Sequence, residues 1–263
     1  MMKKSVPLVL ILIGLLELST RFVRADAKPS ASDVIAKVLN ADPWGLSGAA
    51  VTAHADLKDK GGATSQLAFS ARSRRYEATL AKSLVRFTAP VDLAGAGFLQ
   101  IQKSNGDDDR FLFLPELPRS RRISGNLRAN SFMGTDFSFA DLDRRDLRES
   151  TAKSLPEATI DKYPCFHVEY QPSRTDSPYS RVEIWVRTDN SLPLKMNFFD
   201  RANALLKTFT TQEVRRVSGH WYVTRSTMVD RQHSHETVLV LDKVEPAADI
   251  PDDEFTVRNL EKL

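Results

Sequence analysis

The sequence predicts a mainly β protein with a few helices, in which one antiparallel sheet curls on itself. Apolar and polar residues alternate in short runs along most of the chain, a pattern typical of strands with one buried face. Turn signals rich in Gly, Pro, Asn and Asp separate these runs roughly every 8 to 15 residues, which favours a meander whose sequential strands pair. Because no Pro- or Ser-rich linker interrupts the runs, we expect residues 28–263 to form a single domain.

The composition excludes several classes of protein. The chain has 263 residues, of which 41% are hydrophobic and 27% charged, so it is neither a disordered chain nor a multi-span membrane protein. Its 37 Lys and Arg residues against 34 Asp and Glu residues leave a net charge of +3, too small to indicate a nucleic-acid partner. Cys165 is the only cysteine, which excludes an intramolecular disulfide and a multi-cysteine metal site.

The first 27 residues have the pattern of a secretory signal peptide that is cleaved. Lys3 and Lys4 form a positively charged start, an apolar run covers residues 6–16, and Ala25 and Ala27 have the small-x-small form of a cleavage site. The apolar run is much shorter than the roughly 20 residues that a membrane-spanning helix needs. We therefore expect an exported protein, located in the periplasm of a cell with two membranes.

One helix is expected at the start of the mature chain. Ser30 and Asp33 have the spacing of a capping box, and Ile35, Val38 and Leu39 follow on one apolar face. Strands are then expected at residues 49–57, 63–71, 84–87, 98–101 and 111–114, and again at 166–170, 182–186, 194–198, 205–214, 221–229 and 237–244.

Residues 131–142 lie between the two groups of strands and fit neither the helical nor the strand period. The segment is apolar for a loop, since it contains Phe132, Met133, Phe137 and Phe139. We expect a loop that leads into a short helix beginning at Asp136 or Ser138.

The sequence contains no glycine-rich phosphate loop, no G-x-S-x-G, no H-E-x-x-H and no C-x-x-C motif. His233 and His235 would share one face of a strand, an arrangement that can suit a metal, but a closed site generally needs four ligands. A solvated strand end is the simpler interpretation, so we expect no catalytic residue, no metal and no cofactor. Cys165 is expected to be a buried structural thiol.

A cluster of arginines leaves two interpretations open. Arg119, Arg121, Arg122 and Arg128 would form a docking patch for an anionic partner, either a protein or a lipid headgroup. Alternatively they belong to a solvated loop that the nearby acidic residues Asp141, Asp143 and Asp146 neutralise.

Apolar side chains are more conspicuous than chemically reactive ones, with 14 Phe, 3 Trp and 5 Met residues. They either fill the core of the curled sheet or line a cavity for an apolar ligand, and periodicity alone does not separate these possibilities. Strand parity selects the following candidates for lining a lipid cavity: Leu67, Phe69, Phe87, Phe98, Phe111, Phe113, Phe132, Met133, Met196 and Phe198.

Several segments together resemble a known group of periplasmic proteins. They are FLFLP at 111–115, RRISG at 121–125 and SFMGTDFSFADL at 131–142, supported by PVDLAGAG at 90–97 and IPDDEF at 250–255. The sequence resembles the outer membrane lipoprotein-sorting proteins, a LolA-like family, from about residue 31 onward. The resemblance implies an unclosed antiparallel β-barrel of about eleven strands, with helices over its concave face and acyl chains bound between.

The function that the resemblance implies is carriage rather than catalysis. Such a carrier binds the acyl chains of a lipoprotein or lipid and moves it between membranes, touching each only transiently. Burial of each CH₂ group is worth about 0.8 kcal/mol, so a free lipid does not cross water at a useful rate. The irregular apolar segment from Phe132 to Phe139 is our candidate lid.

Two other functions are carried as hypotheses. The first is a lipid-sensing adaptor or regulator of an inner-membrane protein, such as an RND-type exporter, with the arginine-rich loop as the contact. The second is a metal-dependent hydrolase around His233 and His235, which requires at least one further ligand within coordination distance.

Overall fold

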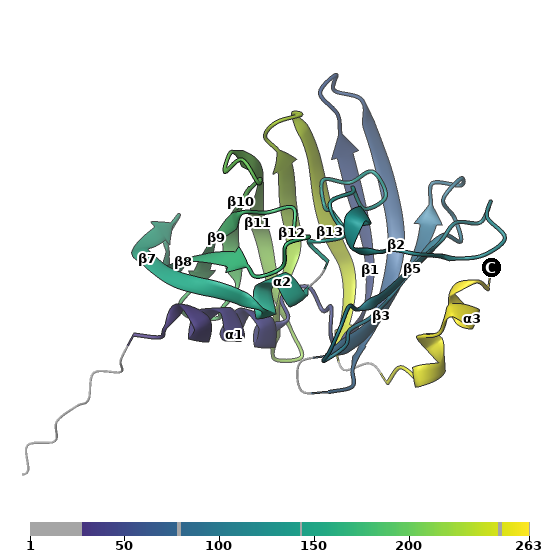
Figure 1. Cartoon of the computed structure of the whole chain (residues 1–263), viewed down its shortest axis with the longest axis horizontal. Coiled ribbons are helices and arrows are strands. Elements are labelled where there is room, and N and C mark those ends of the chain that lie inside the picture. The colour runs from purple at the N-terminus through teal and green to yellow at the C-terminus, as the bar shows by residue number, and fades with distance from the viewer. Residues whose placement is uncertain (1–27, 78–79, 143, 247–248, 263) are drawn as a thin grey trace, which may run out of the picture.

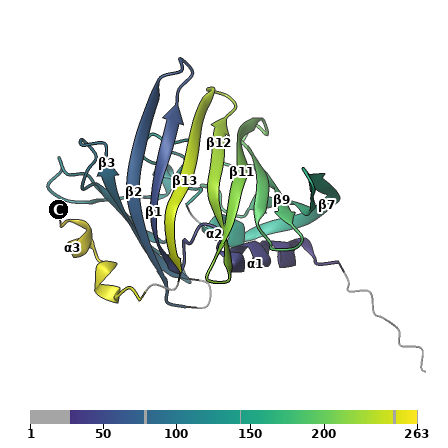
Figure 2. The ribbon, with the colours of Figure 1, turned by 180° about the vertical axis from the view of Figure 1, so that it is seen from behind.

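The computed structural model describes residues 28–77, 80–142, 144–246 and 249–262. Residues 1–27, where the signal peptide is predicted, lie outside this part of the chain, as does Asp143. Within it, 13 strands form one antiparallel sheet in the order β6-β5-β4-β3-β2-β1-β13-β12-β11-β10-β9-β8-β7 (Figures 1 and 2). The edge strands β6 and β7 do not pair with each other, so the curled sheet is unclosed, as the family resemblance implies.

The first strands are β1 (Ala49–Lys58), β2 (Thr64–Arg75), β3 (Ala81–Ala89), β4 (Gly97–Ile101), β5 (Asp109–Phe113) and β6 (Arg121–Arg122). The remaining strands are β7 (Ser150–Ile160), β8 (Tyr163–Pro172), β9 (Arg181–Arg187), β10 (Pro193–Phe199), β11 (Leu205–Val217), β12 (His220–Asp230) and β13 (His235–Pro246). Each strand pairs with its sequence neighbours, except that β1 pairs with β13 and so joins the two meanders.

The predicted strand runs correspond to β1–β5 and β8–β13, and the structure adds β6 and β7. Strand β6 has only two residues, too few to produce a pattern. Strand β7 is an edge strand with no buried residue, and it contains Pro156, which the ladder tolerates at an edge. An exposed edge strand has no buried face to impose alternation, which is why the sequence pattern missed it.

Helix α1 (Ala31–Ala41) begins as predicted. The hydroxyl of Ser30 accepts a hydrogen bond from the Asp33 N–H, and the Asp33 carboxylate accepts one from the Ser30 N–H, which completes the capping box. The buried face of α1 packs on the inner faces of β8–β12, where Val34 and Val38 contact a cluster that contains Ile184.

The short helix expected at Asp136 or Ser138 is not there; helix α2 (Arg144–Arg148) begins later. Residues 131–138 instead form a tight loop, closed by a bridge between Ser131 and Ser138, in which Met133 and Gly134 have positive φ. The Asp136 N–H donates to the Thr237 hydroxyl of β13, so it is not available to a helix. A tertiary contact thus replaces the local hydrogen bonds that a helix would make.

The remaining helices are short: the 3-10 turns η1 (Gly125–Leu127) and η2 (Asp252–Glu254) and helix α3 (Val257–Leu260). The C-terminal segment packs on the outer face of β3–β5, where Phe255 and Leu260 join Leu84, Leu99 and Phe113 in a buried cluster. In Figure 1, α3 accordingly stands apart from α1 and α2. No helix in the described ranges is long and apolar enough to cross a membrane.

Candidate functional site

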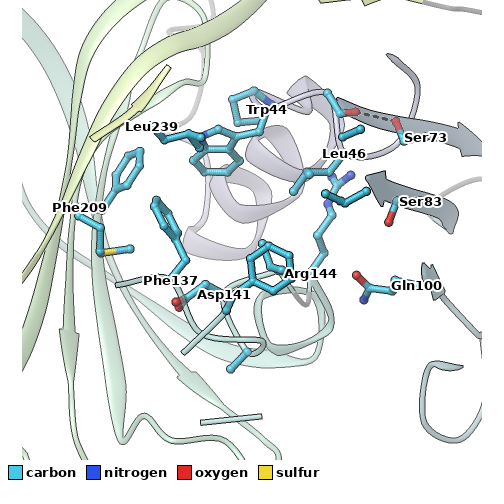
Figure 3. A pocket seen from close by; sticks show the side chains of 18 of the residues that line it. Trp44, Leu46, Ser73, Ser83, Gln100, Phe137, Asp141, Arg144, Phe209 and Leu239 are labelled. Carbon is cyan, nitrogen blue, oxygen red and sulfur yellow. Dashed lines mark hydrogen bonds between the residues drawn. The ribbon is translucent and has the colours of Figure 1, made fainter. Parts of the chain in front are cut away.

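An apolar cavity lies inside the curl of the sheet (Figure 3). Its volume is about 220 Å³, larger than an apolar cavity of roughly 150 Å³ that stays dry and binds benzene. The cavity is therefore larger than a packing void. A cavity that binds lipid on the concave face needs such a volume.

Strand alternation explains the apolar walls. Side chains two residues apart share a face, so Leu67, Phe69 and Ala71 of β2 and Val85 and Phe87 of β3 all point inward. The wall on the other half of the sheet comes from β9–β12 and contains Ile184, Met196, Phe198, Phe209 and Met228.

The segment after α1 closes one side of the cavity. Trp44 lies there and meets Phe209 of β11 edge to face, with ring centroids 5.7 Å apart. Figure 3 shows Trp44 and Leu46 bordering the pocket across from Phe137 and Asp141. The cavity is thus formed by the sheet, the end of α1 and the irregular segment 131–142 together.

Seven of the ten residues selected by parity line this cavity: Leu67, Phe69, Phe87, Phe98, Phe132, Met196 and Phe198. Met133 packs against the neighbouring apolar cluster without lining the cavity. The placement of Phe111 and Phe113 was wrong, because both face the outer cluster under α3.

Register explains the error at β5. This strand is apolar on both faces, so parity in the sequence does not identify its inner side. Leu112 pairs with Phe98 of the cavity wall, whereas Phe111 pairs with Leu99 of the outer cluster. Only the cross-strand pairing places Leu112 inward.

Sequence reasoning missed several lining residues, among them Trp44, Phe137, Arg144, Tyr170, Tyr179 and Phe209. The alternation of β11 contained a signal for Phe209. For Trp44 and Arg144 no local pattern exists, because they reach the cavity from a turn and from the short helix α2.

The segment 131–142, here called the lid segment, inserts two phenylalanines into the wall. The Phe132 ring lies 5.9 Å from that of Phe87 and 5.3 Å from that of Phe98, and Phe139 lies 5.4 Å from both Phe98 and Phe132. Both inserted side chains are buried. Aromatic packing therefore attaches the lid segment to the β3–β4 half of the sheet.

Polar contacts attach the same segment to the other half. The Asp136 carboxylate lies 2.9 Å from the His235 Nδ1 and accepts a 2.7 Å hydrogen bond from the Thr237 hydroxyl, both on β13. Lys207 Nζ of β11 donates to the Asp136 carbonyl oxygen at 3.1 Å and to the Asp141 carboxylate. The lid segment thus bridges the two halves of the sheet across the cavity.

Tyr179 adds a further contact to the lid segment. Its hydroxyl donates to Asp141 Oδ1 at 2.7 Å. Burial and then the nearby Asp141 carboxylate raise the pKa of Tyr179 well above its usual value, so the phenol stays neutral and can donate.

A buried guanidinium lies at the side of the cavity. Arg144 donates to Asp42 Oδ1 at 3.1 Å and to Ser47 Oγ at 2.7 Å. Burial lowers the pKa of Arg144, Asp42 raises it, and the neighbouring Arg75 and Arg148 lower it. Asp42 thus compensates a charge that the apolar surroundings disfavour.

The four arginines of the predicted docking patch do not lie together on the surface. Arg119, Arg121 and Arg122 are exposed. Arg128 was wrongly included: its side chain is 1% exposed and pairs with Asp146 at 2.7 Å and Asp176 at 2.9 Å. A buried arginine between two carboxylates is a structural group and offers nothing to a partner.

The two strand-end histidines each contact a different carboxylate. His233 Nδ1 lies 2.9 Å from Asp230 in an exposed position, whereas His235 Nδ1 lies 2.9 Å from Asp136 of the lid segment. Within the described residues no group of three or more His, Cys, Asp or Glu side chains is arranged to hold a metal. The structure thus places His235 in the lid contacts.

Cys165 is buried on β8, and burial raises the pKa of its thiol. A thiol in such a position is mostly protonated and a poor nucleophile.

Comparison with solved structures identifies the class. A protein from Vibrio parahaemolyticus, named as an outer membrane lipoprotein-sorting protein domain, superposes with a TM-score of 0.80 at 27% identity, covering 87% of this chain and 97% of that one. A DUF1329 family protein from Desulfovibrio piger has a TM-score of 0.82 at 24% identity, covering 88% and 98%. A LolA superfamily protein from Nitrosomonas europaea has a TM-score of 0.71 at 20% identity, covering 87% and 98%.

The fold and the cavity therefore define a LolA-like protein. A family described as "-like: Uncharacterized protein" matches residues 79–262, more than half of the chain. The chain belongs to this family. Its fold is that of the lipoprotein-sorting protein domain and the LolA superfamily protein above, in agreement with the resemblance drawn from the sequence. No curated protein matches it.

Proposed function

We propose that this protein is a periplasmic carrier that binds the acyl chains of a lipoprotein or lipid in the cavity and moves it between membranes. The observation that carries the proposal is the apolar cavity of about 220 Å³ beneath the lid segment. The Vibrio parahaemolyticus neighbour, whose name refers to outer membrane lipoprotein sorting, supports the same reading. Carriage requires binding and release only, so we propose no enzymatic step.

Release requires that the lid segment separate from one half of the sheet. The polar contacts to β11 and β13 are the side that can separate, because opening lets water hydrate both partners of each contact, whereas water does not replace the aromatic packing around Phe132. We therefore propose that the lid segment opens on the side of Asp136 and Asp141 and remains attached at Phe132 and Phe139.

Filling the cavity tests the proposal directly. Ala71 lines the cavity and pairs with Val85, so an Ala71→Phe variant should occupy the space of the ligand. Ala68→Phe is the matched control, since Ala68 lies on the opposite face of the same strand and does not line the cavity. Binding of the fluorescent probe diphenylhexatriene is measured for the mature protein, and bound lipid is identified by native mass spectrometry after gentle purification.

The carrier proposal predicts a stoichiometric acyl-chain ligand in the wild type and loss of probe binding in Ala71→Phe alone. A clean apo mass, with no uptake of probe or of total membrane lipid, would refute it.

A second candidate is a lipid-sensing adaptor for an inner-membrane partner such as an exporter. The exposed side chains of Arg119, Arg121 and Arg122 beside edge strand β6 favour it, because an edge strand and a basic patch both suit a partner protein.

A further inference from the structure

A row of polar side chains ends the apolar wall of the cavity. Ser73 of β2 pairs with Ser83 of β3, which pairs with Gln100 of β4. All three line the cavity. The next inward-facing row, two residues along each strand, is apolar and contains Ala71, Val85 and Phe98. The wall therefore changes from apolar to polar between two successive rows of inward-facing residues.

The two glutamines near this row have fixed amide orientations. Gln100 Nε2 donates to Asp108 Oδ2 at 3.2 Å, and a carboxylate only accepts, so the oxygen Oε1 is the free end of the Gln100 amide. Gln102 Oε1 accepts from the Ala81 N–H at 3.0 Å, and a backbone N–H only donates, so the NH₂ group is the free end of the Gln102 amide. One residue thus offers an acceptor and the other a donor.

These free ends and the Ser83 hydroxyl have no hydrogen-bond partner within the described part of the chain. Gln100 and Gln102 are 4% and 5% exposed, and both line the cavity. None of the three atoms is among the fully enclosed side-chain atoms that lack a partner, so each reaches the space of the cavity. A ligand that exchanges hydrogen bonds with them is favoured over an apolar one. Figure 3 shows Ser83 and Gln100 on the side of the pocket opposite Phe209. A ligand in the cavity would meet these atoms at one end and aromatic rings at the other.

Two arginines near the row each pair with a carboxylate. Arg144 pairs with Asp42 at 3.1 Å, and Arg110 pairs with Asp108 at 3.2 Å. A charged headgroup would lose its hydration beside these ion pairs. In each pair, the charge of the same sign as the headgroup would repel it. An uncharged group that both donates and accepts hydrogen bonds meets no such cost.

We propose that the polar row binds an uncharged headgroup rich in hydroxyl and carbonyl groups, such as an acylglycerol, while its acyl chain lies against Phe87 and Phe98. The inference rests on the proposed carrier function and specifies its ligand class. Ser83, Gln100 and Gln102 are the headgroup contacts, and Ser73 is not, because its hydroxyl already donates to the Gly45 carbonyl oxygen at 2.6 Å.

The test compares three amphiphiles that share a decyl chain. Isothermal titration calorimetry on the mature protein measures the affinities of 1-monodecanoylglycerol, decyl phosphate and decyltrimethylammonium, and diphenylhexatriene reports on the apolar wall alone. We expect the glycerol ester to bind at least about 5-fold more tightly than either charged amphiphile.

Ser83→Ala removes a hydroxyl that makes no hydrogen bond in the described structure, so folding should be unaffected. It should weaken the glycerol ester about 5-fold and leave diphenylhexatriene unchanged. Gln100→Met is the second variant, with the same expectation for binding; because it also removes the hydrogen bond to Asp108, urea unfolding checks its stability. Ser70→Ala is the matched control, since Ser70 lies on the outer face of β2 opposite Arg86.

The outcomes separate the two proposals. If diphenylhexatriene binds but the glycerol ester has no advantage, or both variants bind it as the wild type does, the headgroup assignment is overturned while the carrier function stands. If neither diphenylhexatriene nor any amphiphile binds, the carrier function itself fails.

Discussion

Lys207 of β11 and Asp141 of the lid segment form an ion pair in which each side chain is only 6% exposed. The pair joins elements far apart in sequence, and Lys207 also donates to the Asp136 carbonyl oxygen. A charge in such a position is costly unless its partner is present, so the pair couples the position of the lid segment to the stability of the fold.

We expect Lys207→Met to lower the free energy of unfolding by about 3–5 kcal/mol, because it leaves the Asp141 carboxylate buried with its ammonium partner removed. Urea unfolding of the variant measures this loss. Lys243→Met, which removes an exposed pair with Glu245, should leave the free energy of unfolding nearly unchanged. If both variants lose the same free energy of unfolding, the buried pair contributes no more to stability than the exposed one.

The contacts of Asp136 should control ligand release. Thr237→Val removes both the 2.7 Å hydrogen bond to the Asp136 carboxylate and the 2.9 Å hydrogen bond from the Asp136 N–H at nearly constant volume, and should loosen the lid segment by about 1–3 kcal/mol. We expect bound diphenylhexatriene to dissociate roughly 5-fold faster or more in stopped-flow measurements. His233→Ala is the control, because His233 is hydrogen-bonded to Asp230, which lies outside the lid segment. A release rate unchanged in Thr237→Val would argue against opening on this side.

Asp176, which accepts hydrogen bonds from Arg174 and Arg128, predicts an acid-sensitive contribution to stability. Hydrogen bonds from Arg174, and then the charge of Arg128, lower the pKa of Asp176 to about 2, against the opposing effect of burial. A carboxyl group whose folded-state pKa is depressed stabilises the fold above its unfolded pKa near 3.8, and this contribution is lost as the pH falls toward 2.

Asp176→Asn should therefore cost on the order of 1–2 kcal/mol at pH 7, after allowance for solvent screening, and almost nothing at pH 2. Urea unfolding across this range measures the difference. Asp189→Asn breaks a more exposed pair with Arg187 and should show a smaller effect. If the loss of unfolding free energy in Asp176→Asn does not change with pH, the charge of the carboxylate is not the origin of that loss.

Reversal of the exposed arginines tests the adaptor hypothesis. Arg121→Glu with Arg122→Glu should lower the free energy of unfolding by no more than about 1 kcal/mol, because both residues are exposed and the reversal breaks a surface ion pair, that of Arg122 with Asp109. Binding of diphenylhexatriene should remain intact. If the protein is an adaptor, the double reversal abolishes capture of its membrane partner in a pull-down. Capture that survives the reversal would show that these arginines are not the contact.

Sequence reasoning succeeded where the deciding interactions are local or periodic. The alternation around Leu67 and Phe69 predicted β2 and its inner face, and Ser30 with Asp33 predicted the start of α1, because the residues involved lie within one strand or one helical turn. The segment FLFLP and the lid segment supported the family resemblance. The fold class followed from these features.

Other features depend on long-range register and burial. Phe111 and Phe113 face outward because β5 pairs with β4 in one of two registers, and a strand that is apolar on both faces does not reveal which. Arg128 is buried because Asp146 and Asp176 meet it from distant segments.

The sequence by itself determined the curled antiparallel sheet, its apolar inner face and the first helix, since each follows from a repeat of two or of 3.6 residues. Only the tertiary structure decided which aromatic residues line the cavity, how the lid segment is held and where the polar row lies. The physical reason is that each feature depends on side chains from segments that are distant in the sequence, such as Ser83 with Gln100 and Asp141 with Lys207. Contacts between distant segments produce no repeating pattern in the sequence.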